Sequence, residues 1–389
     1  MSRYRPTRSR LKKRRLTRPA VLPLAVALVA SLSQAPASLA SADQPPAAQR
    51  AGYPTQLAAR PMQPRDPQPG LCWPAGLSLA VPWAVGGTRI LPNGSVRYFP
   101  GDWPDMPVQG IRLWDTRTAW LNIEPADDDW HFAQLDALVA KADARGVSRI
   151  TMVLAGTPRW AATKATPGEA HWLGPGSASP PRDIRQWRDF VRKVATRYVG
   201  RIDAYEIWNE PETPTFFSGT PDQWAQLVKA AAEEIMRVDR AASILASGFI
   251  MTTQGNLNRS LPWLRALAAS GAHVDGLSLH WYPTSWRQIR GLGVIAQRMR
   301  RMAVGLGLPG GLWVTEANAV LRRGFPGRLQ GQVVRGIFEQ AKRAQLHDLT
   351  WYAWLDLPSH LMPIHAGTAA AMALETATAC VAQPAAQQE

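Results

Sequence analysis

The chain has 389 residues, of which 46% are hydrophobic and 19% are charged, and its formal net charge is +15 at pH 7. Nine of the cations fall within residues 1–42, before the first acidic residue at Asp43, which leaves +6 for the rest of the chain. The basic character therefore gives little support to a nucleic-acid-binding protein. The length after residue 70 is enough for one large α/β barrel, which needs about 250 residues.

Residues 1–42 have the organisation of an export signal. A basic stretch precedes the apolar run from Ala20 to Leu32, and small residues follow, with Ser38-Leu39-Ala40 and Ala40-Ser41-Ala42 as candidate cleavage sites. The apolar run is shorter than the roughly 20 residues that span a bilayer. We expect a cleaved signal peptide, a periplasmic or extracellular protein and no stable membrane insertion after cleavage; an uncleaved anchor is the alternative.

The remainder is predicted to contain a linker and one domain. Residues 43–70 are rich in Pro, Ala and Gln and show no hydrophobic periodicity, which is typical of a disordered lead-in, whereas residues 71–389 form the folded domain. Cys72 and Cys380 lie near opposite ends of that domain. They could form a disulfide in an exported protein, or they could be two separate buried thiols.

From residue 76 onward, short apolar runs alternate with longer amphipathic stretches. Eight runs are predicted as strands: 77–81, 109–114, 149–155, 203–208, 244–249, 274–280, 312–316 and 348–354. The stretches between them are predicted as helices, at 132–145, 184–198, 222–238, 261–269, 285–304 and 329–344, with a closing helix at 366–382. Nearly continuous apolar strands suit a parallel sheet buried on both faces, so the pattern predicts a single (β/α)8 TIM barrel.

In such a barrel the active site lies at the C-terminal ends of the strands. That edge combines two carboxylates with a cation, hydroxyl and amide groups and aromatic rings: Arg112, Asp115, Thr157, Trp160, Asn209, Glu210, His280, Tyr282, Glu316 and Trp354. Sugars need this mixture, because their hydroxyls form hydrogen bonds and their C–H faces stack on aromatic rings. Glu210 and Glu316 each end an apolar strand, and paired carboxylates on different strands suit the cleavage of a glycosidic bond.

Several motifs follow one another along the chain: Ile111-Arg112-Leu113-Trp114-Asp115, Thr157-Pro158-Arg159-Trp160, Trp208-Asn209-Glu210-Pro211, His280-Trp281-Tyr282-Pro283 and Thr315-Glu316. In this order they resemble the clan A retaining glycoside hydrolases, and most closely family 39 with its β-xylosidases and exopolysaccharide glycosidases. The resemblance implies that Glu210 is the general acid/base and Glu316 the nucleophile. It also implies substrate-binding or supporting roles for Asn209, Arg112, His280, Tyr282, Trp160 and Trp354.

Structural interpretations compete at several of these positions. Glu206 has the same strand parity as Glu210 and is expected to form a structural ion pair with Arg112 or another cation. Asp115 could cap a loop or bind a hydroxyl. Four tryptophans beyond strand ends could be sugar platforms or core residues: Trp160, Trp281, Trp286 and Trp354. No metal-ligand spacing or phosphate-binding loop occurs, so neither a metal nor a cofactor is expected.

The sequence thus predicts a retaining β-glycosidase that acts on an oligosaccharide or polysaccharide. Two alternatives remain: a carbohydrate-binding or exopolysaccharide-assembly protein without turnover, and a transglycosylase on the same barrel. The loops expected at 156–182, 211–220 and 250–260 would set the sugar specificity.

Overall fold

The computed structural model describes residues 78–80, 87–90, 96–99, 103, 108–114, 116–164, 173–320, 327–352 and 372. Several predictions lie outside these residues: the signal peptide, the linker, Cys72, Cys380, Asp115, Trp354 and, apart from residue 372, the closing helix. Within the described part, no helix is both long and apolar enough to cross a membrane.

Eight parallel strands form a closed barrel, in the order β1-β10-β9-β8-β7-β6-β5-β4, with β4 pairing back onto β1. Their bounds are β1 Ser78–Ala80, β4 Gly110–Leu113, β5 Arg149–Leu154, β6 Ala204–Asn209, β7 Ser243–Ile250, β8 Gly276–Trp281, β9 Leu312–Ala317 and β10 Leu349–Trp351. Every predicted strand coincides with one of them. The (β/α)8 barrel predicted from the sequence is therefore confirmed.

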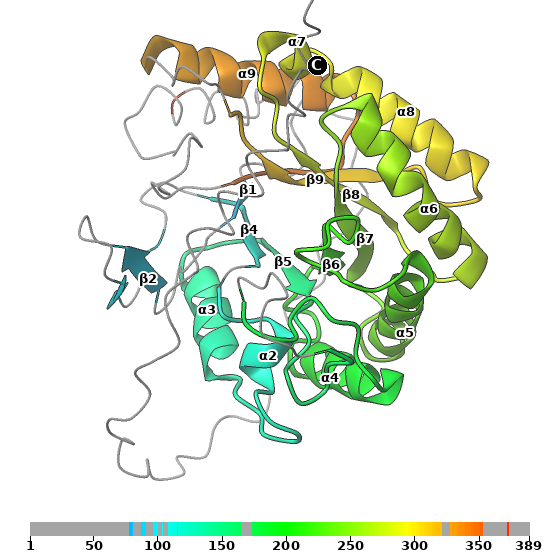
Figure 1. The fold of residues 1–389 in the computed structure, drawn as a ribbon. Helices are drawn as coiled ribbons and strands as arrows, with labels where there is room; N and C mark the ends of the chain where they lie inside the picture. Colours follow the sequence, from blue (N-terminus) through cyan, green and yellow to red (C-terminus); the bar gives the residue numbers. More distant parts are fainter. Residues whose placement is uncertain are drawn as a thin grey trace, which may run out of the picture.

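Helices flank the strands below, to the right and above in the view of Figure 1. Their bounds are α2 Trp120–Ile123, α3 Ala133–Ala144, α4 Ile184–Arg197, α5 Pro221–Val238, α6 Gln254–Ser270, α7 Trp286–Ile289, α8 Leu292–Gly305 and α9 Gly327–Arg343. A two-stranded antiparallel hairpin, β2 Gly87–Ile90 and β3 Val96–Phe99, lies outside the barrel sheet.

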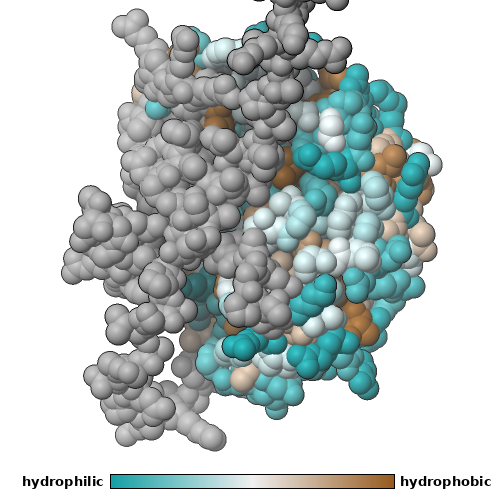
Figure 2. Space-filling model, viewed as in Figure 1, coloured by the Kyte–Doolittle hydropathy of each residue, from teal (hydrophilic) through white to brown (hydrophobic). Residues whose placement is uncertain are grey.

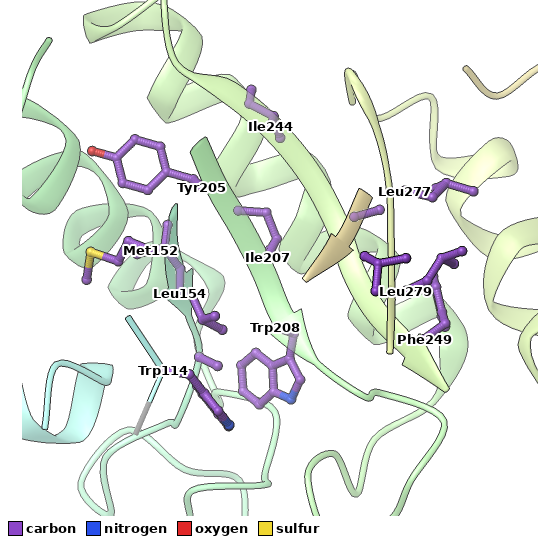
Figure 3. Close-up of a cluster of buried hydrophobic side chains, with 14 of the residues drawn as sticks. Trp114, Met152, Leu154, Tyr205, Ile207, Trp208, Ile244, Phe249, Leu277 and Leu279 are labelled. Atoms are coloured by element: carbon purple, nitrogen blue, oxygen red, sulfur yellow. The ribbon is translucent and has the colours of Figure 1, made fainter. Parts of the chain in front are cut away.

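The core lies where the strands meet this ring of helices. Figure 3 shows side chains from four neighbouring strands, among them Met152 on β5, Trp208 on β6, Phe249 on β7 and Leu279 on β8. All four are at most 1% exposed. Strands β6 and β8 are buried along their whole length, which explains why their sequences do not alternate between polar and apolar residues.

The structure differs from the local predictions in several places. Helix α6 begins at Gln254 and not at Leu261, because Thr253 and Asn256 form a capping box that starts the helix within the predicted 250–260 loop. The single helix predicted at 285–304 is two helices, since α7 ends before Arg290–Gly291 and α8 begins at Leu292. The hairpin β2–β3 was not predicted.

Candidate active site

The predicted site residues come from four strands that end at the same rim of the barrel. Arg112 lies near the end of β4 and Glu316 near the end of β9. Asn209 ends β6 and Glu210 follows it, while His280 lies near the end of β8 and Tyr282 directly follows that strand. All six have buried or largely buried side chains. The structure therefore brings together residues that are up to 204 positions apart in the chain.

The end of β6 departs from regular strand geometry. Trp208 has φ 74° and Glu210 has φ 41°, values that residues other than glycine rarely adopt. Trp208 packs outward against Trp187 of α4, whereas Asn209 accepts a hydrogen bond from Arg112 inside the barrel. The irregular backbone lets two successive residues, Asn209 and Glu210, reach the interior, and such strain at a strand end is frequent at functional sites.

Strand β9 contains a comparable irregularity. Its register with β8 shifts between Val314 and Glu316, so that Thr315 is skipped in the ladder. This bulge lets Thr315 and Glu316 both point inward, where Thr315 contacts Glu206 and Glu316 contacts Arg112. Bulges that redirect a side chain in this way are common next to active sites.

Arg112 lies at the centre of the polar network. Its guanidinium donates through Nε to Glu206 Oε2 at 2.7 Å, through Nη1 to Glu316 Oε1 at 2.6 Å and through Nη2 to Asn209 Oδ1 at 3.0 Å. The side chain is fully buried. Arginine suits this position because its planar fork stays charged and donates in several fixed directions at once.

Glu206 is a structural partner of this arginine, and the ion pair expected from its strand parity is confirmed. Its second oxygen, Oε1, accepts hydrogen bonds from Ser278 at 2.7 Å and from Thr315 at 2.9 Å. A buried carboxylate is costly unless its charge and its lone pairs are satisfied. Here one cation and two hydroxyls supply that compensation, so Glu206 fixes Arg112 beneath the two other glutamates.

Both carboxylate oxygens of Glu316 accept hydrogen bonds. Arg112 binds Oε1, and the Tyr282 hydroxyl donates to Oε2 at 2.5 Å. Burial and the adjacent Glu316 charge raise the pKa of Tyr282, so its hydroxyl keeps the proton that it donates. A carboxylate oriented in this way is suited to nucleophilic attack.

Glu210 lies in different surroundings. Burial raises its pKa well above the ordinary value, and the negative charges of Glu316 and Glu212 raise it further. Its Oε1 is 2.7 Å from His280 Nδ1, whereas Oε2 is buried and has no hydrogen-bond partner among the described residues. A protonated carboxyl with one free oxygen can act as a general acid.

His280 connects the two glutamates. Burial, followed by the positive charge of Arg112, lowers its pKa well below the ordinary value, so the ring is neutral. Its Nε2 faces the Arg112 Nη2 donor at 3.5 Å, which places the ring proton on Nδ1, toward Glu210 at 2.7 Å and Glu316 at 3.4 Å. A side chain at Gly248 would overlap this ring, since an added Cβ would lie 2.0 Å from Nε2.

The two carboxylates are close enough to act on one sugar. One oxygen each of Glu210 and Glu316 and one nitrogen of His280 all lie within 4.8 Å of one another. Retaining glycosidases place their carboxyl groups about 5–5.5 Å apart, whereas inverting enzymes need about 6.5–9.5 Å. A cation bound by these three groups would meet the Arg112 guanidinium already paired with Glu316, so the donor set is poorly suited to a metal.

Other predicted residues lie away from this network. Thr157 donates to the carbonyl of Ser179, and Trp160 donates to the carbonyl of Glu124 while its ring meets Trp120 edge-on. Trp281 is 1% exposed and belongs to the core. Trp160 and Trp286 are partly exposed and pack against that core.

Sequence reasoning overlooked Glu212, Ser278 and Gly248. Glu212 accepts a hydrogen bond from the Ile250 backbone at 2.7 Å, and burial raises its pKa to about 7. Ser278 has the same parity as His280 on β8, a signal that could have placed it in the interior. Glu212 follows an irregular turn and Gly248 has no side chain, so periodicity indicates neither of them.

Comparison with solved structures shows that other proteins have the same fold. A glucosidase from Croceicoccus marinus matches with a TM-score of 0.53 and 16% sequence identity, over 72% of this chain and 60% of that one. A family 39 glycoside hydrolase from the gut symbiont Bacteroides cellulosilyticus WH2 matches with a TM-score of 0.52 and 14% identity, over 70% of this chain and 58% of that one. The barrel is thus one that glycoside hydrolases also have.

Comparison of sequences points to one glycoside hydrolase family, which the structural matches do not. The model of the glycosyl hydrolases family 39 matches residues 129–298, a segment that contains Glu210 and His280 but not Arg112 or Glu316. A beta-xylosidase from Caldicellulosiruptor saccharolyticus is 30% identical over 118 residues, which are 28% of this chain and 23% of that protein. These matches confirm the resemblance to family 39. The chain spans less than two thirds of the length of each of these three relatives.

Proposed function

We propose that the chain is a retaining β-glycosidase that hydrolyses O-glycosidic bonds of an oligosaccharide or polysaccharide. The observation that carries this proposal is the pairing of Glu210 and Glu316 within 4.8 Å, in surroundings that raise the pKa of Glu210 and bind Glu316 through the Arg112 guanidinium. The family 39 match supports the same reaction class.

The reaction is a double displacement. An oxygen of Glu316 attacks the anomeric carbon while the glycosidic C–O bond breaks and Glu210 gives its proton to the leaving oxygen. A glycosyl ester on Glu316 results. Glu210, now ionised, takes a proton from water, and the resulting hydroxide attacks the anomeric carbon and releases Glu316. Each glutamate returns to its starting protonation state, and no cofactor is required.

The neighbouring residues orient these steps. Arg112 and Tyr282 hold the two Glu316 oxygens before the attack, and they stabilise the carboxylate when it leaves. Neutral His280 holds Glu210 Oε1, which leaves Oε2 as the oxygen that faces the leaving group. Asn209, fixed by Arg112 at 3.0 Å, would bind a sugar hydroxyl through its amide nitrogen.

Kinetics of three variants on a panel of activated aryl β-glycosides test these roles. Glu316→Ala is expected to lose roughly 10⁴-fold or more in kcat, and azide should restore turnover with formation of an inverted glycosyl azide. Glu210→Ala should keep turnover only on substrates with good leaving groups. Glu339→Ala, a change at an exposed glutamate of α9, is the matched control and should leave kcat unchanged.

The outcome also separates the alternatives. Wild type that binds a glycan without cleaving any panel member, with both site variants binding equally well, would contradict the enzyme and support a binding protein. Transfer to an added sugar acceptor in preference to water would identify a transglycosylase.

We further propose that the protein is exported, on the basis of the basic, apolar and small-residue order within residues 1–42. Mass spectrometry of the protein recovered from the periplasm and the medium should find a new N-terminus at Ser41 or Asp43. Recovery of the intact chain from the membrane fraction would instead support the uncleaved anchor.

A further inference from the structure

Charge is distributed unevenly around the ring of helices. Residues 184–238, which carry α4 and α5, hold eight cations and eight acids. Residues 254–310 and 327–345, which carry α6 to α9, hold eleven cations and only two acids, Asp275 and Glu339. Four of the eight acids in the first range do not lie on the helices: Asp203, Glu206, Glu210 and Glu212. Counted on the helices alone, α4 and α5 carry a net charge of +3 and α6 to α9 a net charge of +9.

Six of the seven cations on α4 and α5 form ion pairs. Arg188 on α4 forms ion pairs with Glu233 and Glu234 on α5, and Arg197 binds Asp136 on α3 at 2.6 Å. These pairs connect neighbouring helices, so arginines on that side contribute to the packing of the fold. Little positive charge is left there for an external partner.

Six arginines on the other side define a surface that we call the basic face: Arg259, Arg265, Arg287, Arg298, Arg301 and Arg335. All six are exposed, and none has a carboxylate within 4 Å among the residues that the structure describes. Arg298 hydrogen-bonds the side chain of Gln254, which links α8 to the start of α6. In the view of Figure 2 the surface over α6 and α8 mixes hydrophilic with hydrophobic residues, and α8 exposes Val294 and Val304 beside its arginines.

The basic face begins beside the candidate active site. Arg259 lies close enough to Glu212, two residues beyond Glu210, for its positive charge to act on that carboxyl. Arg287 is on α7, which follows the end of β8 and Tyr282 by only a few residues. From there α8 extends for 14 residues, a length of about 20 Å. A long ligand could therefore contact the helices and the rim of the barrel together.

We propose that the basic face binds an acidic polysaccharide, with carboxylate-bearing sugars on α6 and α8 and the same chain entering the site at Glu210 and Glu316. Arginine matches this ligand because its guanidinium binds a carboxylate through two parallel hydrogen bonds. Nucleic acid and an anionic membrane would also be attracted by this positive charge. A glycan is favoured because the basic face begins beside the candidate active site. This proposal rests on the proposed function and specifies its substrate class.

Binding of the full chain to polygalacturonate and to alginate tests the proposal, with the carboxyl-reduced form of each polymer as a neutral comparison. Wild type is expected to prefer the acidic forms at low salt and to lose that preference at high salt. R298Q/R301Q should bind the acidic polymers about fivefold more weakly. R145Q/R240Q removes two exposed charges elsewhere on the barrel and should change binding less than about twofold.

Three results would overturn the inference: equal binding of acidic and reduced polymers, equal losses in the two double variants, or tighter binding to duplex DNA or phosphatidylglycerol vesicles. Hydrolysis of aryl glycosides is measured in parallel. If aryl glycosides are hydrolysed but acidic polymers are not preferred, the acidic-polysaccharide inference is wrong and the proposed function stands. If acidic polymers are preferred but aryl glycosides are not hydrolysed, the proposed function is wrong and the binding of acidic polymers stands.

Discussion

At the scale of single residues, the site separates two chemically identical side chains. Glu210 and Glu316 share a small buried volume, and two close carboxylates resist ionising together. Arg112 and Tyr282 bind Glu316, whereas Glu210 has neutral His280 as its hydrogen-bond partner and one oxygen without a partner among the described residues. The direction of proton transfer therefore follows from the neighbours of each carboxyl and not from the residue type.

Glu212 is expected to raise the pKa of Glu210. Its charge is one of the causes that raise the pKa of Glu210, after burial and Glu316, and its own pKa is raised to about 7. Glu212→Gln keeps the oxygen that accepts from Ile250 and removes the charge, so the pKa of Glu210 should fall. The acid form of Glu210 would then be lost at lower pH. We expect the alkaline limb of the kcat/KM profile to move to lower pH.

The control for this measurement is Glu339→Gln, which changes an exposed glutamate on α9 and should leave the pH profile in place. An alkaline limb that stays fixed or moves to higher pH in Glu212→Gln would show that Glu212 does not act on Glu210.

The sequence allowed some of these site residues to be predicted and not others. Arg112, Glu210 and Glu316 were predictable because each polar group interrupts or ends an apolar strand. Ser278 has the same type of signal but a less conspicuous side chain. Glu212 could not be identified, because its position depends on the irregular turn after Glu210 and on a backbone donor of β7.

At the scale of single elements, irregular strands place the chemistry. Regular alternation would turn Asn209 away from Glu210 and Thr315 away from Glu316. The unusual backbone at Trp208 and the bulge at Thr315 turn both residues of each pair inward. No local sequence signal specifies either feature, since both arise from packing and pairing with neighbouring strands.

Strand β7 contributes to the site because its Gly248 leaves space for the His280 ring. Gly248 faces the His280 ring, and an alanine Cβ there would lie 2.0 Å from Nε2. In Gly248→Ala the ring must move, which breaks its contact with Glu210, so kcat should fall by about 10–100-fold and unfolding should become easier by about 1–3 kcal/mol. Kinetics and urea unfolding measure the two effects.

Gly305→Ala is the matched glycine control, because Gly305 ends α8 and an added Cβ meets nothing within 4 Å. It should leave kcat unchanged and leave stability equal or slightly higher. Similar kinetics in the two variants would show that close packing of His280 is not required.

At the scale of the whole molecule, one end of the barrel carries the candidate site and the other end is expected to contribute to stability. The carboxyl ends of the strands carry the candidate site, while the opposite end carries a network that closes the barrel. There Ser78 of β1 donates to Asp348, at 3.0 Å and 3.2 Å to its two oxygens, and accepts from Arg149 of β5 at 2.8 Å. Groups at this end are expected to affect stability and not catalysis.

Ser78→Ala tests that division. Loss of the buried hydroxyl leaves Asp348 and Arg149 each short of one hydrogen bond, so the free energy of unfolding should fall by about 1–3 kcal/mol. The kcat should stay within about twofold of wild type. Urea unfolding and aryl glycoside kinetics are the two readouts, and a large loss of kcat with unchanged stability would contradict this account.

Most of the barrel was predictable from the sequence, because eight apolar runs buried on both faces leave few other arrangements. The start of α6 was not, since its polar first turn resembles a loop until the Thr253 capping box is seen. The hairpin β2–β3 was missed although Asn93-Gly94, a turn-forming pair, separates its strands in the sequence. Hydrophobic periodicity gives no evidence for short elements that lie outside the repeating pattern of strand and helix.

The central claim is that Glu210 and Glu316 form a retaining pair, and the most direct test is the anomeric configuration of the first product. Proton NMR recorded from the start of hydrolysis of an aryl β-glycoside should show the β-anomer first, with the α-anomer appearing only through mutarotation. Initial release of the α-anomer would require single displacement by water, and it would contradict the assignment of Glu316 as the nucleophile.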